Sequence, residues 1–252
     1  QVILACLNFA QTYYVKNERF TDEIIESCRA LLQLKELYGN APAQAFGLTQ
    51  LQGRICADLG ASTGGFTDCL LQHGAARVYA VDVGYGILHW KLRNDPRVMV
   101  MERKNARYVA GFPEQVSLVT IDASFISLKI LLPTVKSWWA QTGGQVVALI
   151  KPQFEAGREE VAHGDGVVRD PAVHRKVLAD VLGFATVEGF AVRGLVRSGL
   201  LGPKGNTEFL VWLEYPGTAT ADVEMLIEQA LLSPLPNADH GQAPERGFDG
   251  EG

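Results

Sequence analysis

The sequence has few cysteines and no long hydrophobic run, and each shortage excludes a class of protein. The four cysteines, Cys6, Cys28, Cys56 and Cys69, form no Cys-x-x-Cys pair. This argues against a zinc site and against a disulfide framework, so no metal is expected. No apolar run approaches the roughly 20 residues that span a bilayer. No amphipathic basic helix is evident, so membrane insertion is not expected. Reduced thiols and the absence of a secretion signal predict a cytoplasmic protein.

An excess of positive charge is also missing, because the formal net charge is −5. Nucleic-acid-binding proteins usually carry a basic footprint. Cations nevertheless gather locally, at Lys91, Arg93, Arg97, Arg103, Lys104 and Arg107. This patch is either a solvated face or a surface that contacts phosphates.

A short strand, a glycine-rich turn and a helix follow one another near the start of the chain's central part. The apolar strand 55–59 contains Asp58, and the helix begins near Phe66. Between them the turn contains Gly60, Gly64 and Gly65. Glycine lets a backbone approach a ligand closely, and the N–H groups at a helix start point toward it. This arrangement predicts a site for a nucleotide-type cofactor.

Asp82 follows the next strand, 77–81, roughly twenty residues after the turn, where an acidic side chain can bind both hydroxyls of a ribose. The turn fits neither Gly-x-Gly-x-x-Gly nor a P-loop, so a pyrophosphate is not indicated. An adenosine cofactor without phosphates, S-adenosylmethionine, fits better. The predicted cofactor contacts are Asp58, Gly60, Ser62, Thr63, Gly64, Gly65, Phe66, Asp82, Val83, Asn105 and Asp122.

Strand-like and helix-like segments alternate through the rest of the chain. Strands are predicted at 55–59, 78–81, 98–101, 118–122, 146–150, 187–195 and 208–214, and helices at 21–38, 66–73, 87–92, 128–140 and 172–184. This alternation predicts an α/β fold, Rossmann-like, with helices on both faces of a mostly parallel sheet. No helical segment separates the last two strands, so one strand should be antiparallel. We expect an N-terminal segment (1–50), the α/β domain (51–217), a helical segment (218–232) and a disordered tail (233–252).

Seven blocks of the sequence, in order, resemble the hemolysin A (TlyA-type) ribosomal RNA methyltransferases, which are FtsJ-like enzymes. The blocks are DLGASTGGFTD (58–68), AVDVGYG (80–86), ERKNARY (102–108), TIDASFISL (120–128), IKPQFEAGR (150–158), GVVRDP (166–171) and GNTEFL (205–210). The resemblance implies a seven-stranded methyltransferase sheet and S-adenosylmethionine as the methyl donor. It also implies a ribose 2′-hydroxyl of ribosomal RNA as the acceptor, and so ribosomal RNA or ribosomal subunits as partners.

The resemblance implies three catalytic residues: Asp122, Lys151 and Glu208. A ribose hydroxyl is a poor nucleophile, so its attack needs a base or a group that lowers its pKa. A desolvated lysine can act as such a base, and a neighbouring carboxylate can orient it. Each of the three lies at the end of a predicted strand. The competing interpretation is that such charges only cap the sheet.

Two departures from the family concern the residues that would bind and activate the RNA acceptor. Aligning Arg29 and Leu34 with the family's helix places Gln33 where the family has its first catalytic lysine. The family's N-terminal RNA-binding domain is also not evident. An alternative is therefore a cofactor-binding or interaction protein, hemolysin-like, with impaired catalysis. The expected RNA contacts are Arg29, Lys91, Arg93, Arg158 and Arg169. A homodimer is left open.

Overall fold

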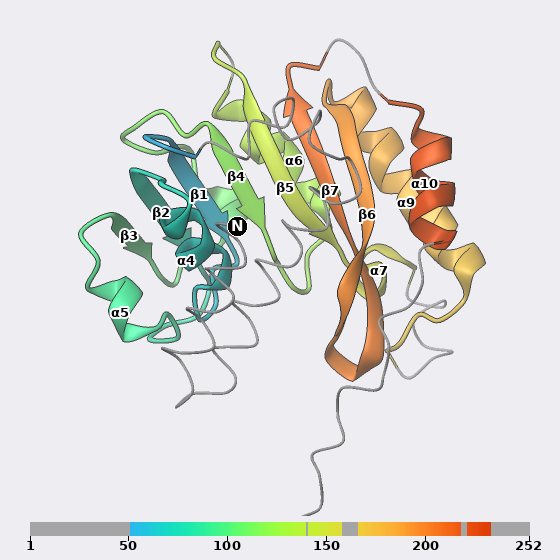
Figure 1. The fold of residues 1–252 in the computed structure, drawn as a ribbon, viewed down its shortest axis with the longest axis horizontal. Coiled ribbons are helices and arrows are strands. Elements are labelled where there is room, and N and C mark those ends of the chain that lie inside the picture. The colour runs from blue at the N-terminus through green and yellow to red at the C-terminus, as the bar shows by residue number, and fades with distance from the viewer. Residues whose placement is uncertain (1–50, 140, 158–165, 218–220, 233–252) are drawn as a thin grey trace, which may run out of the picture.

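A computed structural model describes residues 51–139, 141–157, 166–217 and 221–232. The segments 1–50 and 233–252 lie outside these ranges. So do the predicted helix 21–38, Arg29, Gln33 and Arg158. In the described part, one central sheet carries helices on both faces (Figure 1).

The strands follow the apolar segments of the sequence closely. They are β1 (Ile55–Leu59), β2 (Arg77–Val81), β3 (Val98–Met101), β4 (Leu118–Ile121), β5 (Gly144–Ile150), β6 (Ala191–Gly202) and β7 (Asn206–Tyr215). Six of the seven lie within a few residues of the prediction. The exception is β6, expected at 187–195. Its start is displaced because the preceding helix runs through Val187 and ends at a turn with Gly189 at φ 90°.

The sheet has the strand order β3-β2-β1-β4-β5-β7-β6. The pairs β1–β2, β2–β3, β1–β4 and β4–β5 are parallel, whereas β7 is antiparallel to both of its neighbours. The predicted single antiparallel strand is therefore confirmed. Because β7 runs backwards, its first residues lie at the edge where the parallel strands end.

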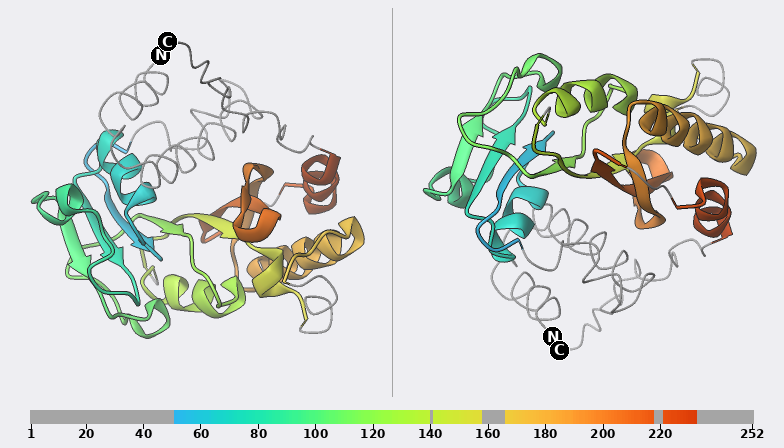
Figure 2. Two further views of the ribbon diagram at one scale, coloured as in Figure 1. Left: turned by 90° about the horizontal axis from the view of Figure 1, so that it is seen from below. Right: turned by 90° about the horizontal axis from the view of Figure 1, so that it is seen from above.

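The helices divide between the two faces of the sheet. They are α4 (Gly65–Gln72), α5 (Trp90–Arg93), α6 (Leu128–Ser137), α7 (Pro152–Glu155), α9 (Pro171–Val187) and α10 (Val223–Leu232), with short 3-10 turns η1 (Ala106–Tyr108) and η2 (Pro203–Gly205). One core cluster joins α6, α9 and α10 to the sheet, and a second joins α4 and α5 to it. Figure 2 shows α4 and α6 on opposite sides of the sheet.

Local sequence explains where the main helices begin. Ser127 caps α6, because its hydroxyl accepts a hydrogen bond from the Lys129 N–H. Asp170 caps α9 in the same way, and Pro171 occupies the first helical position. Helix α5 begins at Trp90 rather than near Ile87 because the side chain of His89 caps it.

Candidate functional site

Strand register brings three loops together at one edge of the sheet. Leu59 at the end of β1 pairs with Val81 of β2 on one side and with Ile121 of β4 on the other. The residues that follow these three strand ends therefore emerge side by side. They are Gly60, Asp82 and Asp122.

Gly60 allows the first loop to pass close to the third. Its φ is +84°, and a Cβ there would lie 2.4 Å from the carbonyl oxygen of Asp122. No side chain fits at that separation, and a positive φ favours glycine. The N–H groups of Gly60 and Ala61 both donate to the Val81 carbonyl, at 2.9 and 3.1 Å. The turn is thus fixed against both neighbouring strand ends.

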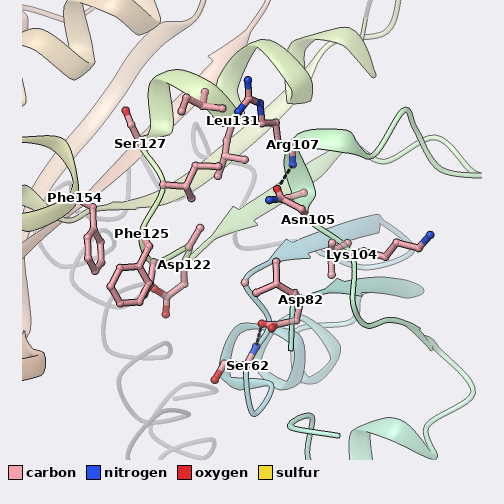
Figure 3. Close-up of a pocket in the computed structure, with 18 residues that line it drawn as sticks. Ser62, Asp82, Lys104, Asn105, Arg107, Asp122, Phe125, Ser127, Leu131 and Phe154 are labelled. Atoms are coloured by element: carbon pink, nitrogen blue, oxygen red, sulfur yellow. Dashed lines mark hydrogen bonds between the residues drawn. The ribbon is translucent and has the colours of Figure 1, made fainter. Parts of the chain in front are cut away.

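The carboxylate of Asp82 joins the first loop to the second. One oxygen accepts a hydrogen bond from the Ser62 N–H at 2.8 Å, and the other accepts one from the Gly84 N–H at 2.7 Å. Figure 3 shows Ser62 and Asp82 facing each other across the base of the pocket. These two bonds orient the carboxylate, whose remaining lone pairs can accept hydrogen bonds from a ligand.

Asp58 does not contact the pocket, contrary to its predicted role as a cofactor contact. The residue is completely buried, and its two oxygens accept from the hydroxyls of Thr67 (2.7 Å) and Thr120 (2.8 Å). Burial raises the pKa of this carboxyl to about 6, and the two hydroxyl bonds oppose that rise. Asp58 therefore ties β1 to α4 and β4 beneath the turn.

The predicted contacts at the start of α4 also face the protein interior. Gly64 has φ +108°, and a Cβ there would lie 2.2 Å from Leu92 Cδ1. Gly65 is buried, and Phe66 packs in the core shared by α4 and α5. The Thr63 carbonyl accepts from the His89 N–H at 3.0 Å. These residues shape the turn because the first turn of α4 points into the core.

A pocket of about 840 Å³ opens between the three loops (Figure 3). Six predicted cofactor contacts line it: Gly60, Ser62, Asp82, Val83, Asn105 and Asp122. The Asn105 side-chain oxygen accepts from the Arg107 N–H at 3.0 Å and so caps η1. This leaves the amide NH₂ of Asn105 as the donor that can reach a ligand.

Lys151 and Asp122 form an ion pair next to this pocket. Lys151 Nζ lies 2.5 Å from Asp122 Oδ1 and 3.4 Å from the Ser124 hydroxyl. The lysine side chain is 10% exposed and the aspartate side chain 36% exposed. The short contact holds the lysine amine in one direction at the edge of the pocket.

Glu208 joins this pair because of the antiparallel register of β7. Ile150 pairs with Phe209, so the next residue along β5, Lys151, lies beside Glu208. Glu208 is 2% exposed, and its Oε1 accepts from Gln153 Nε2 at 3.2 Å. Burial raises the pKa of the Glu208 carboxyl, although the charge of Lys151 opposes the rise. The three predicted catalytic residues thus lie together.

Helix α7 organises the site through residues that the sequence did not reveal. Glu155 accepts from the Ser127 hydroxyl at 2.5 Å and from the Leu128 N–H at 2.7 Å. The Phe154 ring lies 4.8 Å, centroid to centroid, from the ring of Phe125. Gln153 donates a hydrogen bond to Glu208. The three residues of α7 that follow Pro152 therefore each contact a different part of the site.

Phe125 is the most unusual lining residue. It has φ 62°, which is rare for a bulky side chain, and it is 91% exposed at the mouth of the pocket. Such strained residues concentrate at functional sites. Phe125 lies within the block TIDASFISL (120–128), but a phenylalanine gives no indication of a left-handed backbone, so the sequence did not identify it as a site residue.

The predicted RNA contacts lie in different settings. Arg93 is ion-paired with Glu102, and Lys91 Nζ lies 5.9 Å from the Trp90 ring centroid. Arg169 is exposed just before α9. No group of metal-ligating side chains occurs among the described residues. Within the same ranges, no helix combines the length and apolar character needed to cross a membrane.

Comparison with known proteins gives one consistent family. Residues 27–215 match the model of the FtsJ-like methyltransferases. The "16S/23S rRNA (cytidine-2'-O)-methyltransferase TlyA" of Mycobacterium tuberculosis is 48% identical over 174 residues, 68% of this chain. The match covers 63% of that relative, so the chain spans less than two thirds of its length.

Two further similar proteins carry hemolysin names. "Hemolysin A" of Brachyspira hyodysenteriae is 41% identical over 66% of this chain and 69% of its own. A solved structure from Streptococcus thermophilus, described as a "putative hemolysin", is 47% identical with a TM-score of 0.67. It covers 76% of this chain and 70% of that one.

Proposed function

Because this chain belongs to the FtsJ-like methyltransferase family, we propose that it transfers a methyl group from S-adenosylmethionine to a ribose 2′-hydroxyl of ribosomal RNA. One observation carries this proposal. The ion pair of Lys151 and Asp122, with Glu208 beside it, adjoins a pocket that also contains Asp82. Groups that can activate a hydroxyl therefore share one edge of the sheet with Asp82, the carboxylate proposed to bind the ribose of the cofactor.

The pocket fits the proposed cofactor in size and in polar groups. Its volume of about 840 Å³ lies in the range of small-molecule sites. Asp82 would accept hydrogen bonds from the ribose hydroxyls, and the NH₂ of Asn105 would donate to the adenine. Because Gly60 has no side chain, its loop lies directly against the Asp122 backbone at the edge of the pocket. S-adenosylmethionine would supply an electrophilic methyl group on its sulfonium sulfur.

The chain's own residues would prepare the acceptor hydroxyl. Lys151 Nζ would contact the 2′-oxygen, with Asp122 fixing the direction of the lysine side chain. As an ammonium group, Lys151 stabilises negative charge as it develops on that oxygen; when neutral, it accepts the hydroxyl proton. Glu208 lies close enough for its charge to influence Lys151. Phe125 would present its exposed ring to a base of the incoming RNA.

A second candidate, a cofactor-binding protein without catalysis, is favoured by Gln33 and by the hemolysin names of two similar proteins. Gln33 lies outside the described residues, so its relation to Lys151 is part of the test. If Gln33 impairs catalysis, Gln33→Lys should raise the rate of methyl transfer.

The test is transfer of tritiated methyl groups to undermodified ribosomal subunits by the purified chain. The proposal expects label in rRNA, and a protected, alkali-resistant linkage at the labelled nucleotide. A rise in melting temperature with S-adenosylmethionine but no label from either wild type or Gln33→Lys would favour the second candidate. If S-adenosylmethionine does not raise the melting temperature, both candidates lose their shared premise, which is that the chain binds this cofactor.

A further inference from the structure

The segment that follows β3 carries three cations, of which Arg103 lies near the carboxylate of its neighbour Glu102. Arg103, Lys104 and Arg107 have no ion pair with any described carboxylate. Cations elsewhere in the described ranges are mostly paired, as in Arg77–Glu114, Arg97–Asp95, Lys129–Asp180, Lys136–Glu188 and Arg193–Glu214. The chain as a whole has a net charge of −5, so this cluster of positive charge contrasts with the rest of the protein, and the fold does not require it.

Two exposed tyrosines accompany these cations. The Arg103 guanidinium lies 4.2 Å from the ring centroid of Tyr85, which is 68% exposed. The Arg107 guanidinium lies 5.6 Å from the ring centroid of Tyr108, which is 76% exposed. Each guanidinium covers part of one ring and leaves much of that ring open to solvent. Stacked arginine and aromatic planes of this kind offer a surface on which unpaired bases can stack.

This cluster forms one rim of the pocket. Lys104 and Arg107 are among the lining residues, and in Figure 3 the Lys104 side chain extends away from Asp82 and Asp122. The Arg103 N–H donates to the Gly84 carbonyl at 3.0 Å, which joins this loop to the one that carries Tyr85. The proposed cofactor has no phosphate, so these three cations have no phosphate to bind on it.

We propose that Tyr85, Arg103, Lys104, Arg107 and Tyr108, the tyrosine–cation rim, form a docking surface for a single-stranded segment of the RNA substrate. The cations contact phosphates, and the tyrosines stack on bases. This inference rests on the proposed function for its choice of RNA. Neither of the predicted contacts Lys91 and Arg93 belongs to the rim, and Arg93 is already paired with Glu102.

The rim is tested by the salt dependence of RNA binding to the full chain. The probe is a fluorescent single-stranded RNA of about 16 nucleotides, the upper end of common site sizes. The rim variant is Arg103→Gln, Lys104→Gln and Arg107→Gln combined. The matched control, Lys129→Gln, Lys136→Gln and Arg175→Gln, removes the same charge from α6 and α9, where each cation has an ion-pair partner.

The rim variant should bind more weakly, and the slope of log affinity against log salt should shrink by about 2, for three phosphates on a single strand. The control variant should keep the wild-type slope. Tyr85→Leu and Tyr108→Leu should each weaken binding by about 5- to 150-fold with little change in slope, since stacking carries no charge.

Equal slopes for the rim and control variants, or no binding by wild type, would overturn the inference. A methyl-transfer assay on the same samples separates it from the proposed function. Rim-dependent binding without methyl transfer would support the docking surface and reject the function. Methyl transfer with an unchanged slope in the rim variant would support the proposed function and reject the docking surface.

Discussion

Lys151 Nζ lies 2.5 Å from Asp122 Oδ1, although the two residues end different strands of the sheet. Strand β4 leads into Asp122 and strand β5 into Lys151, and these strands pair in parallel. Glu208 completes the group from the antiparallel strand β7. The chemistry proposed for the site depends on this pair, because Asp122 fixes the lysine amine that is proposed to contact the acceptor.

Replacing Lys151 with methionine should remove methyl transfer while leaving cofactor binding in place. Methionine keeps much of the side-chain volume but offers no amine, so the rate should fall by about 10²- to 10⁴-fold. Tritium transfer gives the rate, and the rise in melting temperature with S-adenosylmethionine reports binding. Lys129→Met, which breaks an exposed ion pair on α6, is the control and should keep the wild-type rate. A similar loss in both variants would contradict the role given to Lys151.

Gly60→Ala should abolish cofactor binding for a steric reason. The added Cβ would lie 2.4 Å from the Asp122 carbonyl oxygen, so the turn must move away from the pocket. Gly53→Ala is the matched control, because Gly53 also has a positive φ (+76°) but has nothing within 4 Å of its Cβ position. Both variants should lose about 1–2 kcal/mol of stability from the strained backbone. Isothermal titration with S-adenosylmethionine should separate them, and tight binding by Gly60→Ala would count against the proposed cofactor site.

Gly202→Ala should lower activity by displacing Glu208. A Cβ at Gly202 would lie 2.1 Å from Glu208 Oε1, so the carboxylate must leave its place beside Gln153. Gly183 lies exposed on α9 with nothing within 4 Å of its Cβ position. There, alanine should raise stability by about 0.5–1 kcal/mol and leave activity unchanged. The steady-state rate and the melting temperature of both variants check this, and full activity in Gly202→Ala would exclude a need for Glu208 in its observed position.

Asp58→Asn should change the pH dependence of stability. The pKa of Asp58 is about 6 in the folded protein and about 3.9 in an unfolded chain. Between these values the folded state binds more protons, so wild-type stability falls as pH rises, and the full penalty is present above pH 6. Asparagine cannot ionise, so its stability relative to wild type should rise by up to about 3 kcal/mol across this window.

Urea unfolding of both proteins between about pH 4 and pH 7 measures this difference. Asp68, whose pKa burial also raises to about 6, is present in both proteins and cancels. Parallel curves for the two proteins would show that Asp58 does not carry the penalty.

Much of the fold could be read from local sequence because its signals are local. Short, mainly apolar runs marked β1 and β3 to the residue, and turn residues marked most boundaries. The start of β6 was misplaced because α9 continues through Val187, whose β-branched side chain favours a strand. Gly189, which follows the end of α9 at a positive φ, was the local signal for the end of this helix.

The sequence by itself determined which residue types lie at the strand ends, and so the identity of Asp82, Asp122, Lys151 and Glu208 as candidates. Only the tertiary structure decided which candidates face a ligand. Asp58 and Phe66, within the same glycine-rich motif, point into the core, whereas Phe125 and Gln153, which were not among the predicted site residues, adjoin the site. The reason is physical: side-chain direction at a strand end depends on register and on the packing of distant elements, and neither is encoded in a short stretch of chain.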